Sequence, residues 1–381
     1  MVGLEPRREL FVGLMSGTSL DGTDGIAVEF STTGATPPLR VLGHARRSFP
    51  AELRAELVAL NHSGADEIHR AALAANALAR EAAAVVDAVL RSATIDPGQV
   101  AAIGAHGQTV RHRPGALGGY TVQLNAPALL AELTGIDVVA DFRSRDVAAG
   151  GQGAPLVPAF HRAMFGRPDA ALAVLNLGGI ANLTMLSPGG AVTGFDTGPA
   201  NVLLDLWCER STGQTFDAAG AWGSRGAVDA RLLDALLAEP YFGAPPPKST
   251  GRDLFNAAWL DARLDGADAR ARLRPQDIQS TLAELTARVV AEAFSAHGNG
   301  AAELIVCGGG ARNADLEARL GRHLAPVGVV PSDRRGLPAD QVEAAAFAWL
   351  ARAFLGRTPG NVPAVTGAAG ARVLGALYPA R

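Results

Sequence analysis

The stretch LFVGLMSGTSLDGTDGIAVEF, residues 10–30, predicts how the first half of the chain folds. Apolar residues fill both arms, at 10–15 and 26–30, and a polar turn rich in glycine and hydroxyl side chains joins them. Such a turn exposes backbone N–H groups without side chains in the way, which suits a phosphate chain. Two carboxylates in the turn, Asp21 and Asp24, would repel bare phosphate, so we expect a divalent cation there, with Asp21 as its ligand. A plain β-hairpin with a Gly/Asp turn is the alternative.

Composition argues against several function classes. The 381 residues are 48% hydrophobic and 19% charged, which allows two domains with substantial cores. A net charge of −3 without a basic stripe argues against a nucleic-acid partner. Lys248 is the sole lysine and follows three prolines, so it fits neither a Walker loop nor a protein kinase, and the sequence assigns it no partner.

Cysteine usage and hydropathy indicate the compartment. Cys208 and Cys307 are isolated and lack metal-ligand spacing, which fits a reducing compartment. The apolar run after the N-terminal charges is shorter than a signal peptide needs, and no stretch approaches membrane-spanning length. We expect a cytoplasmic protein without a membrane partner.

The second half repeats the design of the first. Residues 170–187 read strand, polar turn, strand, with Asn176, Gly178 and Gly179 in the turn. A later strand ends in Gly308, Gly309 and Gly310 before a helix, where a nucleoside could lie against the backbone. Each turn alone is typical of an ordinary connection, but the order hairpin, hairpin, glycine run indicates a nucleotide site. A composition shift near residues 150–168 predicts domains 1–160 and 161–381, with the C-terminal tail allowed to pack back on the first domain.

These three turns together resemble the sugar kinase, actin and heat-shock ATPase superfamily. The resemblance implies an α/β, two-domain actin-like ATPase (ribonuclease H-like) fold with ATP in the interdomain cleft. Seven blocks resemble the anhydro-N-acetylmuramic acid kinase family in particular: GLMSGTSLDGTD, AHGQT, ADFRSRDVAAGGQGAPLVP, NLGGIANLT, FDTGPAN, PPPKSTGR and VTGA. They run in order from Gly13 to Thr366, and they depart from the family pattern at Ala200, where glycine is usual, and at Thr23, where an aliphatic residue is usual.

The family resemblance implies a reaction. An ATP-dependent kinase would open 1,6-anhydro-N-acetylmuramic acid with water and phosphorylate O6, giving N-acetylmuramate 6-phosphate and ADP in peptidoglycan recycling. ATP and Mg²⁺ are the implied cofactors, and a proline-led loop and exposed helices favour a homodimer. The alternatives are an ordinary hexose or N-acetylhexosamine kinase of the same superfamily and a non-enzymatic actin-like nucleotide-binding module.

Candidate site residues follow from these motifs. Asp196 in FDTGP is the expected general base, and a cap of the following helix is the alternative role. His106, Gln108, Arg143, Arg145 and Glu343 are expected on the substrate side, with ion pairs as the alternative for the arginines and a solvent-facing position for Glu343. The expected cofactor-binding residues are Gly17, Thr18, Ser19, Leu20, Asp21, Gly22, Thr23, Asp24, Asn176, Gly178, Gly179, Gly308, Gly309 and Gly310.

Overall fold

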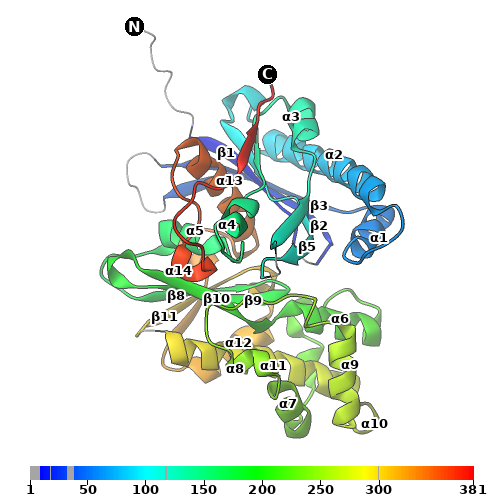
Figure 1. Cartoon of the computed structure of the whole chain (residues 1–381). Coiled ribbons are helices and arrows are strands. Elements are labelled where there is room, and N and C mark those ends of the chain that lie inside the picture. Colours follow the sequence, from blue (N-terminus) through cyan, green and yellow to red (C-terminus); the bar gives the residue numbers. More distant parts are fainter. Residues whose placement is uncertain (1–8, 18, 32–37, 116–117, 299) are drawn as a thin grey trace. The chain divides into compact units, whose positions relative to one another are not determined.

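A computed structural model describes residues 9–17, 19–31, 38–115, 118–298 and 300–381 (Figure 1). The chain divides into two compact units, Met1–Met164 with Gln341–Arg381, and Phe165–Asp340. This division differs from the predicted boundary at 160/161. The residues from Gln341 onward group with the first unit. The sequence analysis counted them in 161–381 but allowed the C-terminal tail to pack back on the first domain.

The first unit is built on a six-stranded mixed sheet in the order β13-β7-β4-β1-β2-β3. Strands β1, β2 and β3 are antiparallel neighbours, whereas β1, β4 and β7 are parallel. The bounds are β1 (Leu10–Met15), β2 (Gly22–Phe30), β3 (Leu39–Ser48), β4 (Ala102–Ala105), β7 (Val138–Ala140) and β13 (Ala376–Tyr378), with a separate hairpin of β5 (Gln108–Arg113) and β6 (Tyr120–Leu124). The helices are α1 (Ala51–Ala59), α2 (Glu67–Ala93), α3 (Pro127–Thr134), α4 (Ser144–Ala148), α5 (Val157–Phe165), α13 (Val342–Leu355) and α14 (Pro363–Thr366).

Helix α13 packs directly on the backbone of this sheet. A Cβ atom on Gly13 of β1 would lie 1.9 Å from the carbonyl oxygen of Ala344, and one on Gly104 of β4 would lie 2.0 Å from that of Phe347. Both glycines are therefore required for the close approach of helix and sheet. The two glycines interrupt otherwise apolar strands for this reason.

A buried carboxylate ties the C-terminal part of the first unit to α4. Asp146 is fully buried, and its Oδ1 accepts hydrogen bonds from Asn361 Nδ2 at 2.6 Å and Thr366 Oγ1 at 2.8 Å. Its Oδ2 accepts from the Gly153 N–H at 2.8 Å. Two segments more than two hundred residues apart in the sequence, 146–153 and 361–366, thus meet at one side chain.

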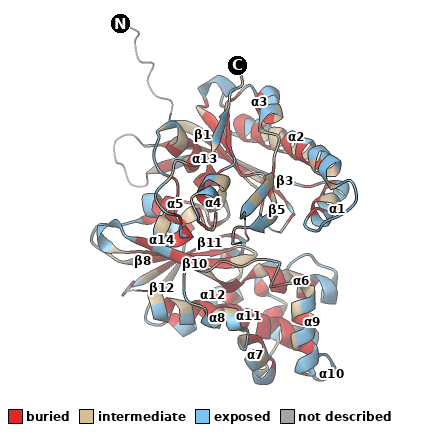
Figure 2. Cartoon of the chain, in the orientation of Figure 1, coloured by how far each residue is buried: buried red, intermediate tan, exposed pale blue. Residues whose placement is uncertain are grey.

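The second unit holds a five-stranded sheet in the order β10-β9-β8-β11-β12. Its strands are β8 (Leu172–Leu177), β9 (Ile180–Leu186), β10 (Val192–Pro199), β11 (Glu303–Cys307) and β12 (Gly328–Pro331). Its helices are α6 (Asn201–Thr212), α7 (Ala230–Leu237), α8 (Pro240–Gly243), α9 (Ala257–Gly266), α10 (Ala269–Arg272), α11 (Pro275–His297) and α12 (Ala314–Leu324). Helix α11 is the most deeply embedded, with fourteen buried residues from Asp277 to Phe294 (Figure 2).

The two sheets share one topology. In each, three consecutive antiparallel strands are followed by strands parallel to the first, so that β3-β2-β1-β4-β7 matches β10-β9-β8-β11-β12. This is the ribonuclease H-like arrangement present twice, and the predicted fold class is confirmed. Among the described residues, no helix combines the length and the hydropathy that a membrane span requires.

Candidate active site

Two buried side chains of the AHGQT motif brace the first hairpin turn. Gln108 accepts a hydrogen bond from the Ser16 hydroxyl through Oε1 and donates one from Nε2 to the Gly17 carbonyl oxygen at 3.1 Å. His106 Nδ1 lies 3.1 Å from the Ser16 carbonyl oxygen. Side chains about ninety residues away in the sequence therefore hold the backbone of the turn in place. Both residues were expected to contact sugar. In the structure, their hydrogen bonds to Ser16 and Gly17 support the turn.

Arg143 fixes the protonation state of His106. Its Nε and Nη2 atoms lie 3.1 Å and 2.9 Å from His106 Nε2, which must accept because a guanidinium only donates. The ring proton then sits on Nδ1 and is donated to Ser16. Burial, followed by the charge of Arg143, lowers the pKa of His106 to about 3, so the ring is neutral at physiological pH. Arg143 Nη1 also donates to the Gly153 carbonyl oxygen at 2.8 Å.

The carboxylates of Asp21 and Asp24 both lie near the guanidinium of Arg46 on β3. Asp21 accepts from the Ser19 hydroxyl at 2.8 Å and pairs with Arg46, whose Nε lies 3.8 Å from Asp24 Oδ1. The described residues contain no group of three or more His, Cys, Asp or Glu that could hold a metal. Mg²⁺ commonly uses one or two carboxylates together with substrate phosphates, so half-exposed Asp21 fits a cation of that kind and not a closed protein site.

Other residues of the first stretch lie differently from the prediction. Strand β2 begins at Gly22 because it pairs with β3 from there onward, so Gly22, Thr23 and Asp24 belong to a strand and not to the turn. The Leu20 side chain is buried in an apolar cluster with Phe49 and Leu53 and anchors the turn. Thr18 lies outside the described residues.

A polar row crosses the sheet of the second unit. Asp196 of β10 is paired in register with Asn182 of β9, Asn182 with Asn176 of β8, and Asn176 with Cys307 of β11. Residues in register on adjacent strands lie within about 5 Å. Asn176 and Asn182 are each 6% exposed, so water does not solvate these amides and they need hydrogen-bond partners within the protein or a ligand.

Asp196 is held by two donors that are not charged. Its Oδ1 accepts from Asn182 Nδ2 and its Oδ2 from the Thr250 N–H, each at 3.0 Å. The helix-cap alternative is wrong, because α6 begins after Ala200 and has no side-chain cap. A bulge between Asp196 and Gly198 breaks the register with β9, a device that re-aims side chains at sheet edges.

The PPPKSTG loop packs against Asp196 and supplies a partner for the sole lysine. The Asp196 N–H donates to the Lys248 carbonyl oxygen at 3.2 Å, and the Tyr241 hydroxyl donates to the Asp196 carbonyl oxygen at 2.8 Å. Lys248 Nζ donates to the carbonyl oxygens of Tyr241 and Phe242 at 3.1 Å and 3.0 Å. Burial lowers the pKa of Lys248, and the charge of Asp196 opposes that shift. The ammonium is therefore part of the electrostatic surroundings of Asp196.

The glycine run packs against the second hairpin. Gly308 has φ of 81°, and a Cβ there would lie 2.4 Å from Asn176 Oδ1, while a Cβ on Gly310 would lie 2.7 Å from Leu177 Cβ. A Cβ on Gly309 would meet nothing within 4 Å. The run continues as a short 3₁₀ turn at Gly309–Arg312, and the helix expected after the glycines begins at Ala314. Helix α12 follows with Asn313 as its cap.

The turn of the second hairpin is tied to the start of α6. The N–H of Asn201 donates to the Gly178 carbonyl oxygen at 3.1 Å, and the N–H of Ala200 to that of Gly179 at 3.0 Å. Of the substrate-side candidates, Arg145 lies exposed on α4, and Glu343 is half-buried in the first turn of α13. His106, Gln108, Arg143, Arg145 and Glu343 belong to the first unit, and Asp196 belongs to the second.

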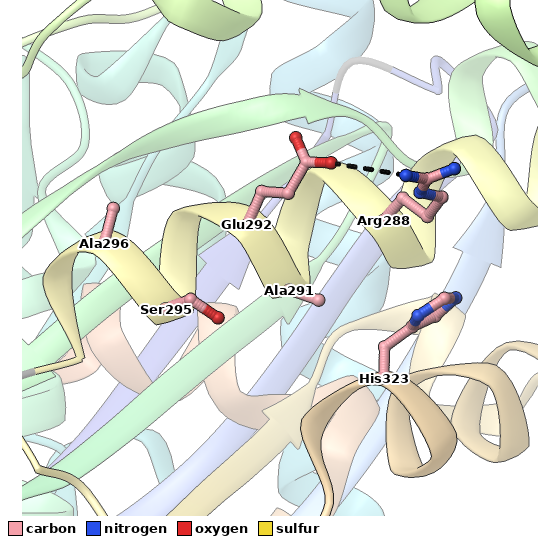
Figure 3. Close-up of a pocket in the computed structure, with 6 residues that line it drawn as sticks. All are labelled: Arg288, Ala291, Glu292, Ser295, Ala296 and His323. Carbon is pink, nitrogen blue, oxygen red and sulfur yellow. Dashed lines mark ion pairs between the residues drawn. The ribbon is translucent and has the colours of Figure 1, made fainter.

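A separate pocket lies between α11 and α12. It is lined by Arg288, Ala291, Glu292, Ser295, Ala296 and His323 (Figure 3). Arg288 and Glu292 form an ion pair one helical turn apart at 3.9 Å. No residue predicted to serve catalysis or cofactor binding lines this pocket, so it is not the candidate active site.

A family model described as anhydro-N-acetylmuramic acid kinase matches residues 9–380. The chain belongs to the anhydro-N-acetylmuramic acid kinase family. Its sequence is 63% identical to the anhydro-N-acetylmuramic acid kinase of Bordetella petrii, over 97% of this chain and 96% of the relative. It is 61% identical to that of Bordetella pertussis over the same shares, and 57% identical to that of Albidiferax ferrireducens over 98% and 100%.

The family identified from the sequence motifs is thereby confirmed, and the chain is a member of a kinase family. Among solved structures, a component of (R)-2-hydroxyglutaryl-CoA dehydratase from Acidaminococcus fermentans aligns over 89% of this chain and 96% of its own with 12% identity. The TM-score of 0.47 does not by itself establish a common fold. For this anhydro-N-acetylmuramic acid kinase family member, the fold assignment rests on its own strand order.

Proposed function

We propose that the chain is an ATP-dependent kinase that opens 1,6-anhydro-N-acetylmuramate with water and phosphorylates the released O6. The products are N-acetylmuramate 6-phosphate and ADP, and the context is the recycling of peptidoglycan sugars. The observation that carries the proposal is the setting of Asp196, in a member of this family, at a bulged strand end with both carboxylate oxygens accepting neutral donors.

Asp196 would act as general base. It accepts a proton from water as the water oxygen bonds to the anomeric carbon, and the C1–O6 bond breaks on the opposite side. The departing O6 bonds to the γ-phosphorus of ATP, and ADP leaves, so the phosphoryl group takes the role that a carboxylic acid plays in an inverting glycosidase. One water proton stays on the new C1 hydroxyl, and the other is released from Asp196 to solvent.

The other predicted site residues would bind and orient ATP, Mg²⁺ and the sugar. The hairpin turns around Ser16 and Gly17 and at 177–180 would offer backbone N–H groups to phosphate oxygens, and the open space at Gly309 would let a nucleoside approach the backbone. Asp21 would hold Mg²⁺ with those phosphates, and this cation supplies charge neutralisation during phosphoryl transfer. Arg145 and Glu343 are proposed to contact the sugar.

Location and assembly also belong to this proposal. Cys208 and Cys307 are buried thiols that are not joined in a disulfide, which agrees with a reducing, cytoplasmic setting. A homodimer is proposed from the proline-led loop and the exposed helices, and sedimentation tests it.

Labelled water separates this reaction from that of an ordinary sugar kinase. The chain is incubated with ATP, Mg²⁺ and the anhydro sugar in H₂¹⁸O, and the product is analysed by mass spectrometry. We expect ¹⁸O at C1 together with one phosphate, and no comparable ADP release with free amino sugars. Phosphorylated product without label would refute ring opening and favour a hexose or N-acetylhexosamine kinase. The absence of sugar-dependent ADP release would favour a binding module.

Substitution of Asp196 tests the base. Asp196→Asn should keep ATP binding and lose turnover on the order of 10³-fold, within the range that general acid–base groups supply. Asp234→Asn on the exposed face of α7 is the matched control and should retain full activity. An Asp196→Asn variant with near-normal turnover would show that the proposed base is wrong.

A further inference from the structure

We propose that Asn182 is a second residue of the hydrolytic step, which holds the attacking water together with Asp196. This inference rests on the proposed function and assigns a role to a residue that the sequence analysis did not single out. The amide is 6% exposed, and its Nδ2 donates to Asp196 Oδ1 at 3.0 Å.

The orientation of the amide is determined by its neighbour. An amide oxygen facing the Asp196 carboxylate would place two acceptors against each other, so the NH₂ group faces the carboxylate and the oxygen faces elsewhere. That oxygen, Asn182 Oδ1, is buried and has no hydrogen-bond partner among the described residues. Buried polar atoms are nearly always paired in folded proteins, and exceptions cluster where a ligand or water binds.

The chemistry of the two acceptors selects the missing partner. Asp196 and Asn182 are in register on adjacent strands and each carries an acceptor oxygen, so a molecule that hydrogen-bonds to both must donate two protons. A sugar hydroxyl or an acetamido N–H offers one, whereas water offers two. A water so held points its lone pairs away from the protein. One proton passes to Asp196 as the C1–O bond forms, and the other remains on the C1 hydroxyl and stays donated to Asn182.

The position is rigid, as this task requires. Asn182 lies in β9 between β8 and β10, with the flanking Ala181 and Leu183 fully buried. Thr250 holds the second oxygen of Asp196, so the carboxylate cannot turn away from the amide without losing a hydrogen bond. Groups held on strands keep a reacting water within the narrow range of geometries that attack demands. An aspartate at position 182 could not do the same, because two adjacent carboxylates would repel.

Three variants of Asn182 test the proposal on the full chain, with the wild type first shown to incorporate ¹⁸O at C1. Asn182→Ala should lower kcat for the anhydro sugar about 30-fold or more while the KM values for sugar and ATP change less than about threefold. Asn182→Ser keeps an acceptor oxygen and should lose less. Asn182→Asp should lose at least as much as the alanine variant. The solvent deuterium isotope effect on kcat should rise in the alanine variant, because proton transfer from a poorly placed water becomes limiting.

The pH profile separates holding the water from merely supporting the fold. Loss of a donor to Asp196 raises the pKa of the base, so the acidic limb of the kcat profile should move to higher pH in Asn182→Ala. Thr184→Ala removes a buried polar side chain two residues further along β9 and serves as the control for folding and ATP binding, with its acidic limb unmoved.

The outcomes distinguish this inference from the proposed function. A kcat for Asn182→Ala within threefold of wild type would refute it, as would a raised KM for sugar with unchanged kcat, which would make Asn182 a sugar contact. A wild type that gives no label at C1 would instead refute the proposed function. If the wild type incorporates label at C1 and Asn182→Ala has the same kcat as the wild type, only the role of Asn182 is refuted.

Discussion

Asp146→Ala should loosen the C-terminal segment of the first unit while leaving its sheet intact. The side chain is fully buried and accepts three hydrogen bonds, one from the nearby Gly153 and two from Asn361 and Thr366 of the C-terminal segment. Alanine removes all three acceptor contacts at once. None of these three hydrogen bonds involves strands β1 to β3, so we expect the destabilisation to be confined to the segments around Gly153 and Asn361–Thr366.

The magnitude follows from the lost contacts. A hydrogen bond to a charged acceptor is worth about 1.5–3 kcal/mol, and an abandoned buried donor costs about 1–3 kcal/mol. Three contacts summed without allowance would overstate the loss, because water can enter the vacated space and the contacts share one carboxylate. We expect about 3–5 kcal/mol for Asp146→Ala and about 1–2 kcal/mol for Asp146→Asn, which keeps one acceptor. For a unit of roughly two hundred residues this lowers the first thermal transition by about 10 °C in the alanine variant.

Calorimetry combined with hydrogen exchange measures the effect. Peptides covering residues 361–370 and 150–156 should exchange faster in Asp146→Ala, while those covering β2 should be unchanged. Asp87→Ala, at an exposed ion pair on α2, is the control and should shift stability by less than about 0.5 kcal/mol. An alanine variant that melts within 2 °C of wild type, with unchanged exchange at 361–370, would refute the reasoning.

Three further perturbations have clear outcomes. Gly13→Ala should lower the free energy of unfolding by about 3 kcal/mol, because its Cβ would meet the α13 backbone, whereas Gly98→Ala has open space and should be nearly neutral; equal urea midpoints would contradict this. Burial lowers the pKa of His161 to about 3, so below its usual value of about 6.5 the unfolded chain binds a proton that the folded chain refuses. The free energy of unfolding should therefore decrease as the pH is lowered from about 6.5 to about 3. His161→Gln should reduce this slope by at most about 1.4 kcal/mol per pH unit, and an unchanged slope in acid titration would contradict the prediction. Gln108→Ala frees Ser16 and Gly17 and should weaken ATP binding about tenfold by calorimetry, and unaltered binding would show that the turn needs no bracing.

The hairpins, the fold class and the family could be predicted from the sequence, because glycine-rich turns between apolar strands are local signals. Contacts that depend on register or on distant segments could not. The pairing of Asn182 with Asp196 depends on the register of β9 with β10. The contact of Lys248 with Asp196 joins residues that lie about fifty positions apart in the sequence. One signal for Asn182 was present: an amide inside a mostly apolar strand.

The grouping of α13 with the first unit could not be derived from the sequence for a related reason. An alanine-rich helix pattern shows that the helix is buried, but it does not show which sheet buries it. Gly13 and Gly104 held a clue, since strand glycines often mark the close approach of another backbone. Similarly, the hydrogen bonds of His106 and Gln108 depend on β4 lying parallel to β1, which brings AHGQT beside the first turn.

The discontinuity of the first unit has a consequence for biosynthesis. Strand β1 emerges from the ribosome before the whole second unit, whereas α13, which covers its sheet, and β13, which joins that sheet, emerge after the second unit. Residues 165–340 are contiguous and can fold during translation, while the glycine-marked face of β1 and β4 waits uncovered until α13 arrives. The nascent chain therefore passes through a long interval in which one unit is finished and the other is exposed to aggregation and to chaperones.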